Sequence, residues 1–168
     1  MSKKPSLRQL LAADAAQRLS TSLLPASPDT WHGWFDGSAL PNPGKIGIGV
    51  LLISPDGTRH EHARKTSRVG CGNEAELHAM IAAMDLALTA DCRRLVLCGD
   101  SQVAIRYVMN QDKTHIERLL PLIALAQNKL LQFEAIELRW IPRHRNHEAD
   151  HLSRVALGLT AQPLSSVP

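Results

Sequence analysis

Residues 31–53 read WHGWFDGSALPNPGKIGIGVLLI, and this stretch decides the fold. The aromatic and apolar run that reaches Asp36 is typical of a strand, and the apolar run at 46–53 predicts a second one. The Gly- and Pro-containing segment between them predicts a short connection. A turn at SPDG, residues 54–57, leads into a third predicted strand at 58–65. Consecutive strands with such short connections are expected to pair as an antiparallel meander.

The sequence after the meander alternates between helical and strand patterns. The predicted elements are, in order, a helix at 73–88, a strand at 95–98, helices at 101–109 and 115–131, a strand at 135–141 and a helix at 147–157. Asn73 is the predicted N-cap of the first helix, and Gly158 is the predicted stop of the last one. The order βββαβααβα predicts an α/β domain with a mixed sheet.

The chain before the meander has a different composition. Residues 5–20 have the apolar spacing of an amphipathic helix, and the Ser-, Thr- and Pro-rich segment at 20–30 is typical of a linker. We therefore place a domain boundary near Asp29. The expected parts are an N-terminal amphipathic helix with its linker at 1–29, a main domain at 30–158 and a disordered tail at 159–168. A docked helix, a dimer contact and a partner site all remain open as roles for the first part.

The composition limits the class of protein. A chain of 168 residues has room for one core, and its 44% apolar and 21% charged residues are ordinary for a globular protein. The net charge of +3 and the pI near 9.0 are compatible with a nucleic-acid partner without requiring one. Three cysteines without CxxC spacing argue against a disulfide framework and favour a cytoplasmic location. Because no apolar run has the length of a signal peptide or a membrane span, we expect no membrane partner.

Four acidic residues stand at the ends of predicted elements, where packing does not explain them. They are Asp36 in WFDGS, Glu76 in NEAEL, Asp100 in CGDSQ and Asp150 in NHEADHLSR. Each has an ordinary alternative as a turn, cap or helix-dipole residue. Strand and helix ends on one side of an α/β sheet converge, however, and converging carboxylates repel one another unless cations lie between them. Mg²⁺ fits such a site because it binds a few carboxylates and keeps water and phosphate oxygens as its other ligands.

These motifs resemble those of the type 1 ribonuclease H family over residues 31–157. The matching motifs are DGS, NPG, AEL, GDSQ, W-x-x-x-H and N-x-x-AD-x-L, in the family's order. The resemblance implies a ribonuclease H-like catalytic domain at 30–158, whose five-stranded sheet has three antiparallel strands followed by two parallel ones. It also implies an endoribonuclease that hydrolyses the RNA strand of RNA–DNA hybrids and leaves 5′-phosphate and 3′-hydroxyl ends. Double-stranded RNA is a second candidate substrate.

The resemblance also implies roles for particular residues. The metal-binding acids of the family correspond to Asp36, Glu76, Asp100 and Asp150. These residues would hold two Mg²⁺ or Mn²⁺ ions, and two such ions would support phosphodiester hydrolysis by a two-metal-ion mechanism. His144 corresponds to a catalytic histidine that assists proton movement or product release in the family, because it stands four residues after the tryptophan of the motif.

Two departures from the family pattern concern substrate binding. The family often has Thr-Asn before the helix that bears the glutamate, where it contacts the nucleic-acid backbone, whereas here Cys71, Gly72 and Asn73 precede Glu74. The chain also has only NQDKT, residues 110–114, where many members carry a basic, Trp-containing handle. The expected substrate contacts are Ser38, Asn42, Asn73 and Ser101.

Two alternatives belong to other functional classes. HEADH at 147–151 matches HExxH, the signature of zinc proteases in which two helical histidines bind zinc and the glutamate is the base. A third zinc ligand is missing downstream, because residues 152–168 contain no His, Asp, Glu or Cys. The other alternative is a non-cleaving nucleic-acid-binding module of the same fold, whose expected sign is a missing carboxylate.

Overall fold

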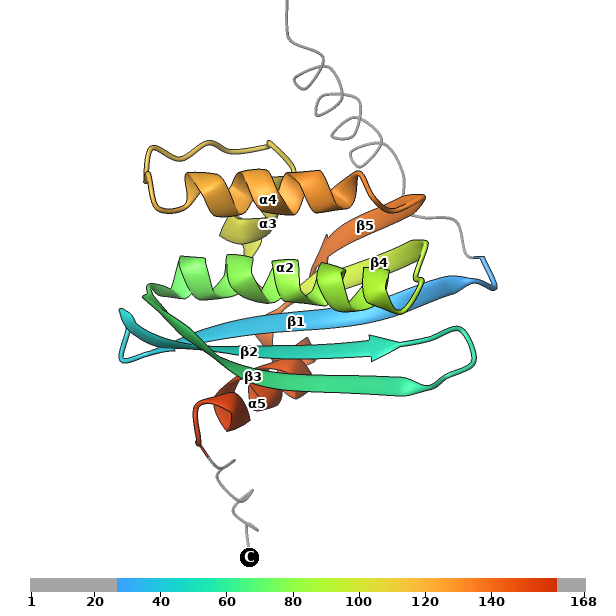
Figure 1. Ribbon diagram of the computed structural model, residues 1–168, viewed down its shortest axis with the longest axis horizontal. Coiled ribbons are helices and arrows are strands. Elements are labelled where there is room, and N and C mark those ends of the chain that lie inside the picture. Colours follow the sequence, from blue (N-terminus) through green and yellow to red (C-terminus); the bar gives the residue numbers. More distant parts are fainter. Residues whose placement is uncertain (1–26, 160–168) are drawn as a thin grey trace, which may run out of the picture.

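The computed structural model describes residues 27–159, which form one domain around a central sheet (Figure 1). The elements in chain order are β1 (Thr30–Leu40), β2 (Gly44–Ile53), β3 (Arg59–Gly70), α2 (Gly72–Thr89), β4 (Arg94–Gly99), α3 (Gln102–Val108), α4 (Leu120–Leu130), β5 (Ala135–Trp140), the 3₁₀ turn η1 (Arg143–Arg145) and α5 (His147–Ala156). The predicted helix at 5–20 and residues 160–168 of the predicted tail lie outside the described residues.

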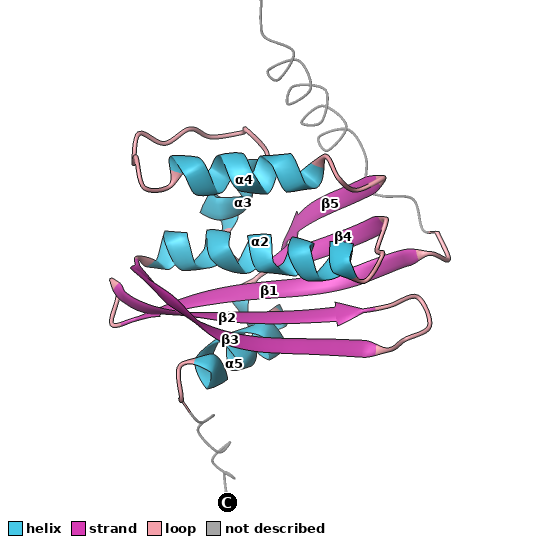
Figure 2. Ribbon diagram, in the orientation of Figure 1, coloured by secondary structure: helices cyan, strands magenta, loops and turns pink. Residues whose placement is uncertain are grey.

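The sheet has five strands in the order β3-β2-β1-β4-β5 (Figure 2). β2 pairs antiparallel with β1 on one side and with β3 on the other. β4 lies parallel to β1, and β5 lies parallel to β4. The predicted α/β class is therefore confirmed, together with the predicted sheet of three antiparallel strands followed by two parallel ones.

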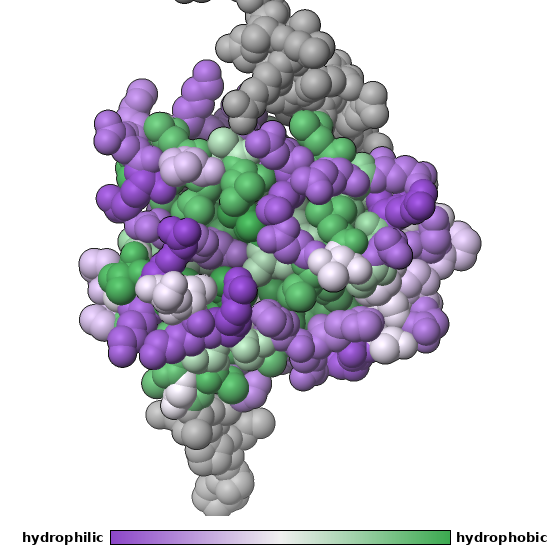
Figure 3. All heavy atoms as spheres, in the orientation of Figure 1, coloured by the Kyte–Doolittle hydropathy of each residue, from purple (hydrophilic) through white to green (hydrophobic). Residues whose placement is uncertain are grey.

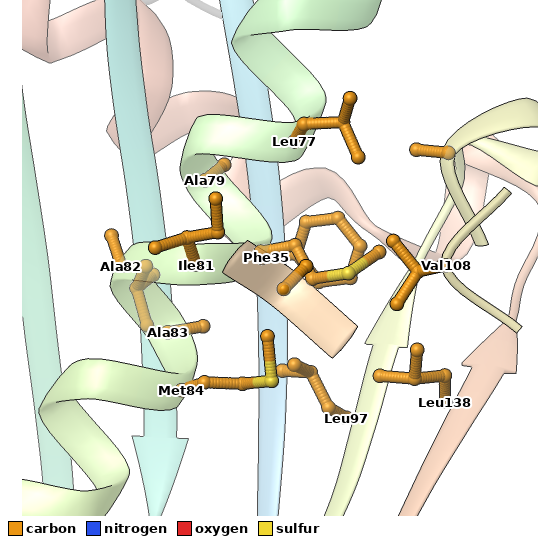
Figure 4. Close-up of a cluster of buried hydrophobic side chains, with 14 of the residues drawn as sticks. Phe35, Leu77, Ala79, Ile81, Ala82, Ala83, Met84, Leu97, Val108 and Leu138 are labelled. Atoms are coloured by element: carbon orange, nitrogen blue, oxygen red, sulfur yellow. The ribbon is translucent and has the colours of Figure 1, made fainter. Parts of the chain in front are cut away.

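Helices cover both faces of the sheet. α2 packs on β1 and β2 and also contacts α3 and α4, so these helices form a layer on one face. α5 packs on β1, β2 and β3 from the opposite face, behind the sheet in Figure 1. The apolar core fills the space between α2 and the sheet, where Phe35, Leu77, Met84 and Leu97 meet with no exposed surface (Figure 4). Burial of this apolar surface is the main favourable term in folding.

Three elements differ in extent from the sequence prediction. The first strand does not stop at Asp36, because its pairing with β2 continues through the DGS motif to Leu40. β3 likewise extends to Gly70, which pairs with Gly44 at the start of β2. The helix expected at 115–131 begins only at Leu120, since Pro121 stands in its first turn and proline is tolerated there but not in a helix interior.

The surface that carries α2 and α4 mixes polar and apolar side chains (Figure 3). Leu120 and Leu125 are exposed apolar residues on α4. Cys71, Cys92 and Cys98 are free thiols. Within residues 27–159, no helix combines the length and the apolar character that crossing a membrane requires.

Candidate metal and active site

The parallel pairing of β1 and β4 brings two of the expected acids together. The last pair of this ladder joins Phe35 to Gly99, so the next residues, Asp36 and Asp100, emerge side by side. β4 ends at this point while β1 continues along β2. Asp36 is buried, with 5% of its surface exposed, and Asp100 is half-buried. The edge at the carboxyl end of the parallel strands is where α/β folds commonly place their sites.

α2 adds Glu76 to the same edge through a close approach to β1. A Cβ atom at Gly37 would collide with the carbonyl group of Ala75 and with the backbone nitrogen of Glu76. Only glycine fits between the strand and the first turns of the helix, because backbone atoms of an ordered helix cannot move aside cheaply. Gly37 of the DGS motif therefore sets the distance between Asp36 and Glu76.

The start of α2 also frees Glu76 from a capping role. The helix begins at Gly72 with Cys71 as its N-cap, so the predicted N-cap at Asn73 is wrong by two positions. Glu74 accepts a hydrogen bond from the backbone nitrogen of Cys71 at 3.3 Å, as the acidic member of a capping box does. β3 ends at Gly70 and α2 begins two residues later, before Asn73 is reached, although asparagine is a preferred N-cap residue. Glu76 is left with no part in the cap.

Asp36, Glu76 and Asp100 form a cluster of carboxylates whose ligand oxygens all lie within 4.8 Å of one another. Burial is the main reason that the pKa of Asp36 is raised to about 6, and repulsion from Asp100 and Asp150 acts in the same direction against a hydrogen bond from Ser153. Burial and the charges of Asp36 and Asp100 raise the pKa of Glu76 well above its usual range. The charge of Asp100 thus destabilises the charged forms of Asp36 and Glu76.

The donor set of this cluster fits a hard divalent cation. Oε2 of Glu76 is buried and has no hydrogen-bond partner, which is a costly state for a carboxylate oxygen. A cation bound between the three carboxylates would supply that oxygen with a partner and offset their repulsion. Oxygen-only ligands of this kind suit Mg²⁺ or Mn²⁺ rather than a thiolate- or imidazole-preferring metal.

The fourth expected acid, Asp150, lies beside the cluster and not within it. It is the fourth residue of α5, and it is close enough to Asp36 to raise the pKa of that carboxyl. Its own Oδ1 lies 3.3 Å from Nε of Arg154 and 4.0 Å from Nη2 of Arg143. The structure therefore brings three of the four acids together and pairs the fourth with arginines.

Two polar residues that the sequence analysis did not single out connect α5 to the cluster. Asn146 is 1% exposed, and its Nδ2 donates to the carbonyl oxygen of Phe35 at 2.9 Å and to Oδ2 of Asp100 at 3.1 Å. The fully buried Ser153 donates to Oδ2 of Asp36 at 2.6 Å. The asparagine belongs to the quoted N-x-x-AD-x-L pattern, which was the available signal. The only signal for the serine was its place one helical turn after Asp150.

The other expected site residues surround this edge. His144 is exposed on η1, in the turn that leads to α5. Oδ1 of Asn42 accepts a hydrogen bond from the backbone nitrogen of Gly72 at 3.0 Å, and Asn73 is the second residue of α2. These two asparagines thus lie at the junction of the β1–β2 turn and the start of α2.

Two serines of the expected substrate contacts have partners within the protein. The hydroxyl of Ser38 lies 2.7 Å from that of Ser153. Ser101 is the N-cap of α3, where its hydroxyl accepts from the backbone nitrogen of Ala104 at 3.2 Å. Because Ser101 takes the capping role, the adjacent Asp100 is free for the carboxylate cluster.

Within residues 27–159 the HExxH segment has two helical histidines but neither a third ligand nor a free glutamate for a zinc site. Glu148, which would be the base, pairs with Arg59 of β3 at 3.0 Å. His147 and His151 are exposed on α5. Among residues 27–159, the one convergent group of at least three His, Cys, Asp and Glu side chains is the carboxylate cluster.

Comparison with known proteins places this arrangement in a family context. Residues 34–156 match the model of the family described as reverse transcriptase-like. The chain is 31% identical over 126 residues to ribonuclease HI of Halobacterium salinarum, a match that covers 75% of this chain and 63% of that protein. The chain thus spans just under two thirds of the length of this curated relative.

Solved structures show the same architecture. The crystal structure of RNase H1 from Halobacterium salinarum superposes with a TM-score of 0.73 at 30% identity, over 77% of this chain and 98% of that one. The crystal structure of LC11-RNase H1 in complex with an RNA/DNA hybrid superposes with a TM-score of 0.68 at 26% identity, over 76% and 96% of the two chains. The likeness extends over nearly the whole of both solved domains.

Proposed function

Since the chain belongs to the reverse transcriptase-like family and its fold superposes on that of an RNase H1, we propose that residues 30–158 form a ribonuclease H domain. Its reaction is hydrolysis of the RNA strand of an RNA–DNA hybrid, which leaves 5′-phosphate and 3′-hydroxyl ends. A solved structure of similar fold, LC11-RNase H1, is a complex with such a hybrid. Selection of RNA over DNA would rest on the 2′-hydroxyl, the group that distinguishes the two at a given site.

The observation that carries this proposal is the cluster of three carboxylates, one buried and two half-buried, with one unpartnered oxygen at Glu76. Asp36, Glu76 and Asp100 would hold two Mg²⁺ or Mn²⁺ ions, with Asp150 joining them once it exchanges its arginine partners for metal. When bound, divalent ions would activate a water for attack on phosphorus and stabilise the leaving oxygen. The carboxylates themselves perform no covalent chemistry.

The remaining residues bind substrate or handle protons. His144 is exposed beside the site and is free to exchange a proton with the solvent during turnover. Asn42 and Asn73 offer amide groups at the start of α2 for contacts with the nucleic-acid backbone. Amide groups of this kind position a phosphate without reading the base sequence.

Cations for the phosphates come from β3 in place of a basic handle. Arg64, Lys65 and Arg68, which we call the β3 basic surface, are exposed and line a shallow depression with His78 of α2. Arg68 also borders a second depression that is lined by Arg118, just before α4. Arg64 and Arg68 approach His78 of α2, the helix that carries Glu76, whereas Lys65 follows Arg64 directly on the strand and points to the opposite face of the sheet.

One set of assays tests the proposal. End-labelled RNA–DNA hybrid, double-stranded RNA and double-stranded DNA are each incubated with the full chain in Mg²⁺, Mn²⁺ or EDTA. The expected result is cleavage of the RNA strand of the hybrid with either metal and none in EDTA, and no cleavage of double-stranded DNA. Binding of the hybrid without cleavage in any metal would contradict the nuclease assignment and identify a binding module. The result for double-stranded RNA defines how strict the hybrid preference is.

A further inference from the structure

Ser153 of α5 is a fully buried hydroxyl surrounded by polar groups of the site. Its Oγ lies 2.6 Å from Oδ2 of Asp36, 2.7 Å from Oγ of Ser38 and 2.8 Å from the backbone carbonyl oxygen of Asp150. Ser153 has no exposed surface, and Asp36 is 5% exposed. The contact between them is therefore shielded from solvent, where a hydrogen bond to a charged group is strongest.

A count of protons fixes the direction of these hydrogen bonds. A serine hydroxyl has one hydrogen to donate and two lone pairs with which to accept. A carboxylate is a stronger acceptor than a neutral carbonyl, so the proton of Ser153 goes to Asp36 in preference to the carbonyl oxygen of Asp150. The hydroxyl of Ser38 then donates to Ser153. The result is a chain of two hydroxyl groups that ends on the Asp36 carboxylate.

The backbone around this contact is built for a close approach of α5 to the sheet. Asp36 pairs across the β1–β2 ladder with Gly49. A Cβ atom at Gly49 would collide with the carbonyl oxygen of Ala149 and would come within 2.5 Å of the backbone nitrogen of Ser153. The strand neighbour of Asp36 must therefore be glycine for α5 to bring the Ser153 hydroxyl within reach of the carboxylate.

We propose that Ser153 is a positioning residue, whose hydroxyl holds the Asp36 carboxylate in the orientation that lets it share a divalent cation with Glu76 and Asp100. Without the hydroxyl, a buried oxygen of Asp36 loses its hydrogen-bond donor, and the carboxylate is free to turn about its Cβ–Cγ bond. Residues that orient metal ligands from behind typically affect metal affinity or activity by about 10- to 100-fold. The proposal rests on the proposed function, because it concerns the same metal site.

The test measures metal binding directly as well as catalysis. We expect Ser153→Ala in the full chain to bind Mn²⁺ about tenfold more weakly than wild type, by calorimetry without nucleic acid. Under limiting Mg²⁺, kcat for the hybrid should fall by a similar factor and recover as Mg²⁺ is raised. KM for the hybrid should stay within about twofold, since Ser153 is buried and cannot touch substrate.

Two further variants separate positioning from packing. Ser153→Cys keeps a side chain of similar size with a weaker donor, and we expect its Mn²⁺ affinity to lie between those of wild type and the alanine variant. Thr89→Ala is the control, because the hydroxyl of Thr89, like that of Ser153, lies next to a backbone carbonyl one turn earlier on its own helix, that of Asp85, but contacts no carboxylate of the site. Its Mn²⁺ affinity should equal that of wild type.

The outcomes distinguish this proposal from the nuclease assignment. If the alanine variant, folded by circular dichroism, binds Mn²⁺ within twofold of wild type, Ser153 has no positioning role even if the enzyme cleaves hybrid normally. If the alanine variant does not fold, an unchanged affinity in the cysteine variant overturns the proposal in the same way. If the wild-type protein binds Mn²⁺ more tightly than the Ser153→Ala variant but does not cleave the hybrid, the nuclease assignment is wrong while the positioning role of Ser153 stands.

Discussion

Nε of Arg154 lies 3.3 Å from Oδ1 of Asp150, one turn earlier on α5. The Nη2 atom of Arg143 approaches the same oxygen to 4.0 Å. Asp150 is thus paired with protein cations, whereas Asp36, Glu76 and Asp100 lie next to one another. A metal ion that recruits Asp150 has to compete with these arginines.

Replacement of Arg154 should therefore strengthen metal binding. In Arg154→Gln, Asp150 loses its nearer cation and the site loses a positive charge that repels divalent ions, so we expect Mg²⁺ affinity to rise roughly two- to fivefold, the scale of an exposed ion pair. Calorimetry on the full chain measures this Mg²⁺ affinity. Arg145→Gln, which removes an exposed charge on the neighbouring turn η1, is the control and should change the affinity less. A loss of affinity in Arg154→Gln would mean that Arg154 holds Asp150 in its binding position.

Replacement of Asp36 should abolish cleavage and stabilise the metal-free protein. Asp36→Asn removes one of the repelling charges at nearly constant volume. The pKa of Asp36 is about 6 in the folded chain against 3.8 for the free group, so the folded state keeps a proton that the unfolded state has lost. Stability conferred by that proton is full below about pH 4, declines as the pH rises to about 6 and is absent above it.

The asparagine variant lacks this decline, since its side chain does not titrate. In EDTA at pH 7 we expect it to be more stable than wild type by roughly 2 kcal/mol, with the difference shrinking toward pH 4. Urea unfolding at a series of pH values measures the difference. Equal stability at every pH would contradict the raised pKa of Asp36, which burial causes first and repulsion from Asp100 and Asp150 second. Wild-type turnover of the asparagine variant in Mg²⁺ would contradict the metal site itself.

His144→Ala should affect turnover and spare metal binding. His144 is exposed on η1 and is no member of the carboxylate cluster, so its loss removes a proton-transfer group only. We expect kcat to fall about 10²-fold, within the range for a positioned acid or base. Calorimetry should give an unchanged Mg²⁺ affinity. A lost affinity would place His144 in the metal site or in a structural role.

Binding of the hybrid should show only a moderate dependence on salt. The β3 basic surface together with Arg143 and Arg145 offers enough cations for about three or four phosphates, which corresponds to a log–log slope of about −3 to −4. The affinity of Asp36→Asn for hybrid in Ca²⁺, measured from low to moderate salt, gives this slope. Arg64→Gln should reduce the magnitude of this slope by about one. A slope steeper than about −6 would reveal a basic surface elsewhere on the chain.

The sequence predicted the order of the elements and the convergence of three acids because both depend on local pattern, whereas metal binding by the four acids stays a prediction. Asp36, Glu76 and Asp100 stand where strands and a helix end, and the topology alone brings such ends together. Element boundaries were less accurate, because they depend on pairing partners. β3 runs to Gly70 only because Gly44 is opposite to it, and this moves the start of α2 ahead of Asn73.

The supporting polar contacts could not be predicted from the sequence. The roles of Asn146 and Ser153 depend on how deeply α5 sits against the sheet, and that depth depends on Gly49 of a strand about a hundred residues away. Helical periodicity tells which face of α5 a serine occupies, but not which carboxylate lies across from it. The pairing of Asp150 with Arg143 and Arg154 is likewise a matter of side-chain reach.

The edge position of β3 has a consequence for solubility. A 12-residue strand on the rim of a sheet offers unpaired backbone groups on which another copy of the chain could add a strand. The charged side chains of β3 are mostly basic, so pairing of two β3 edges would place like charges opposite one another. Like charges across a strand pair repel. The residues assigned here to phosphate contacts therefore also keep neighbouring copies from associating edge to edge while no nucleic acid covers them.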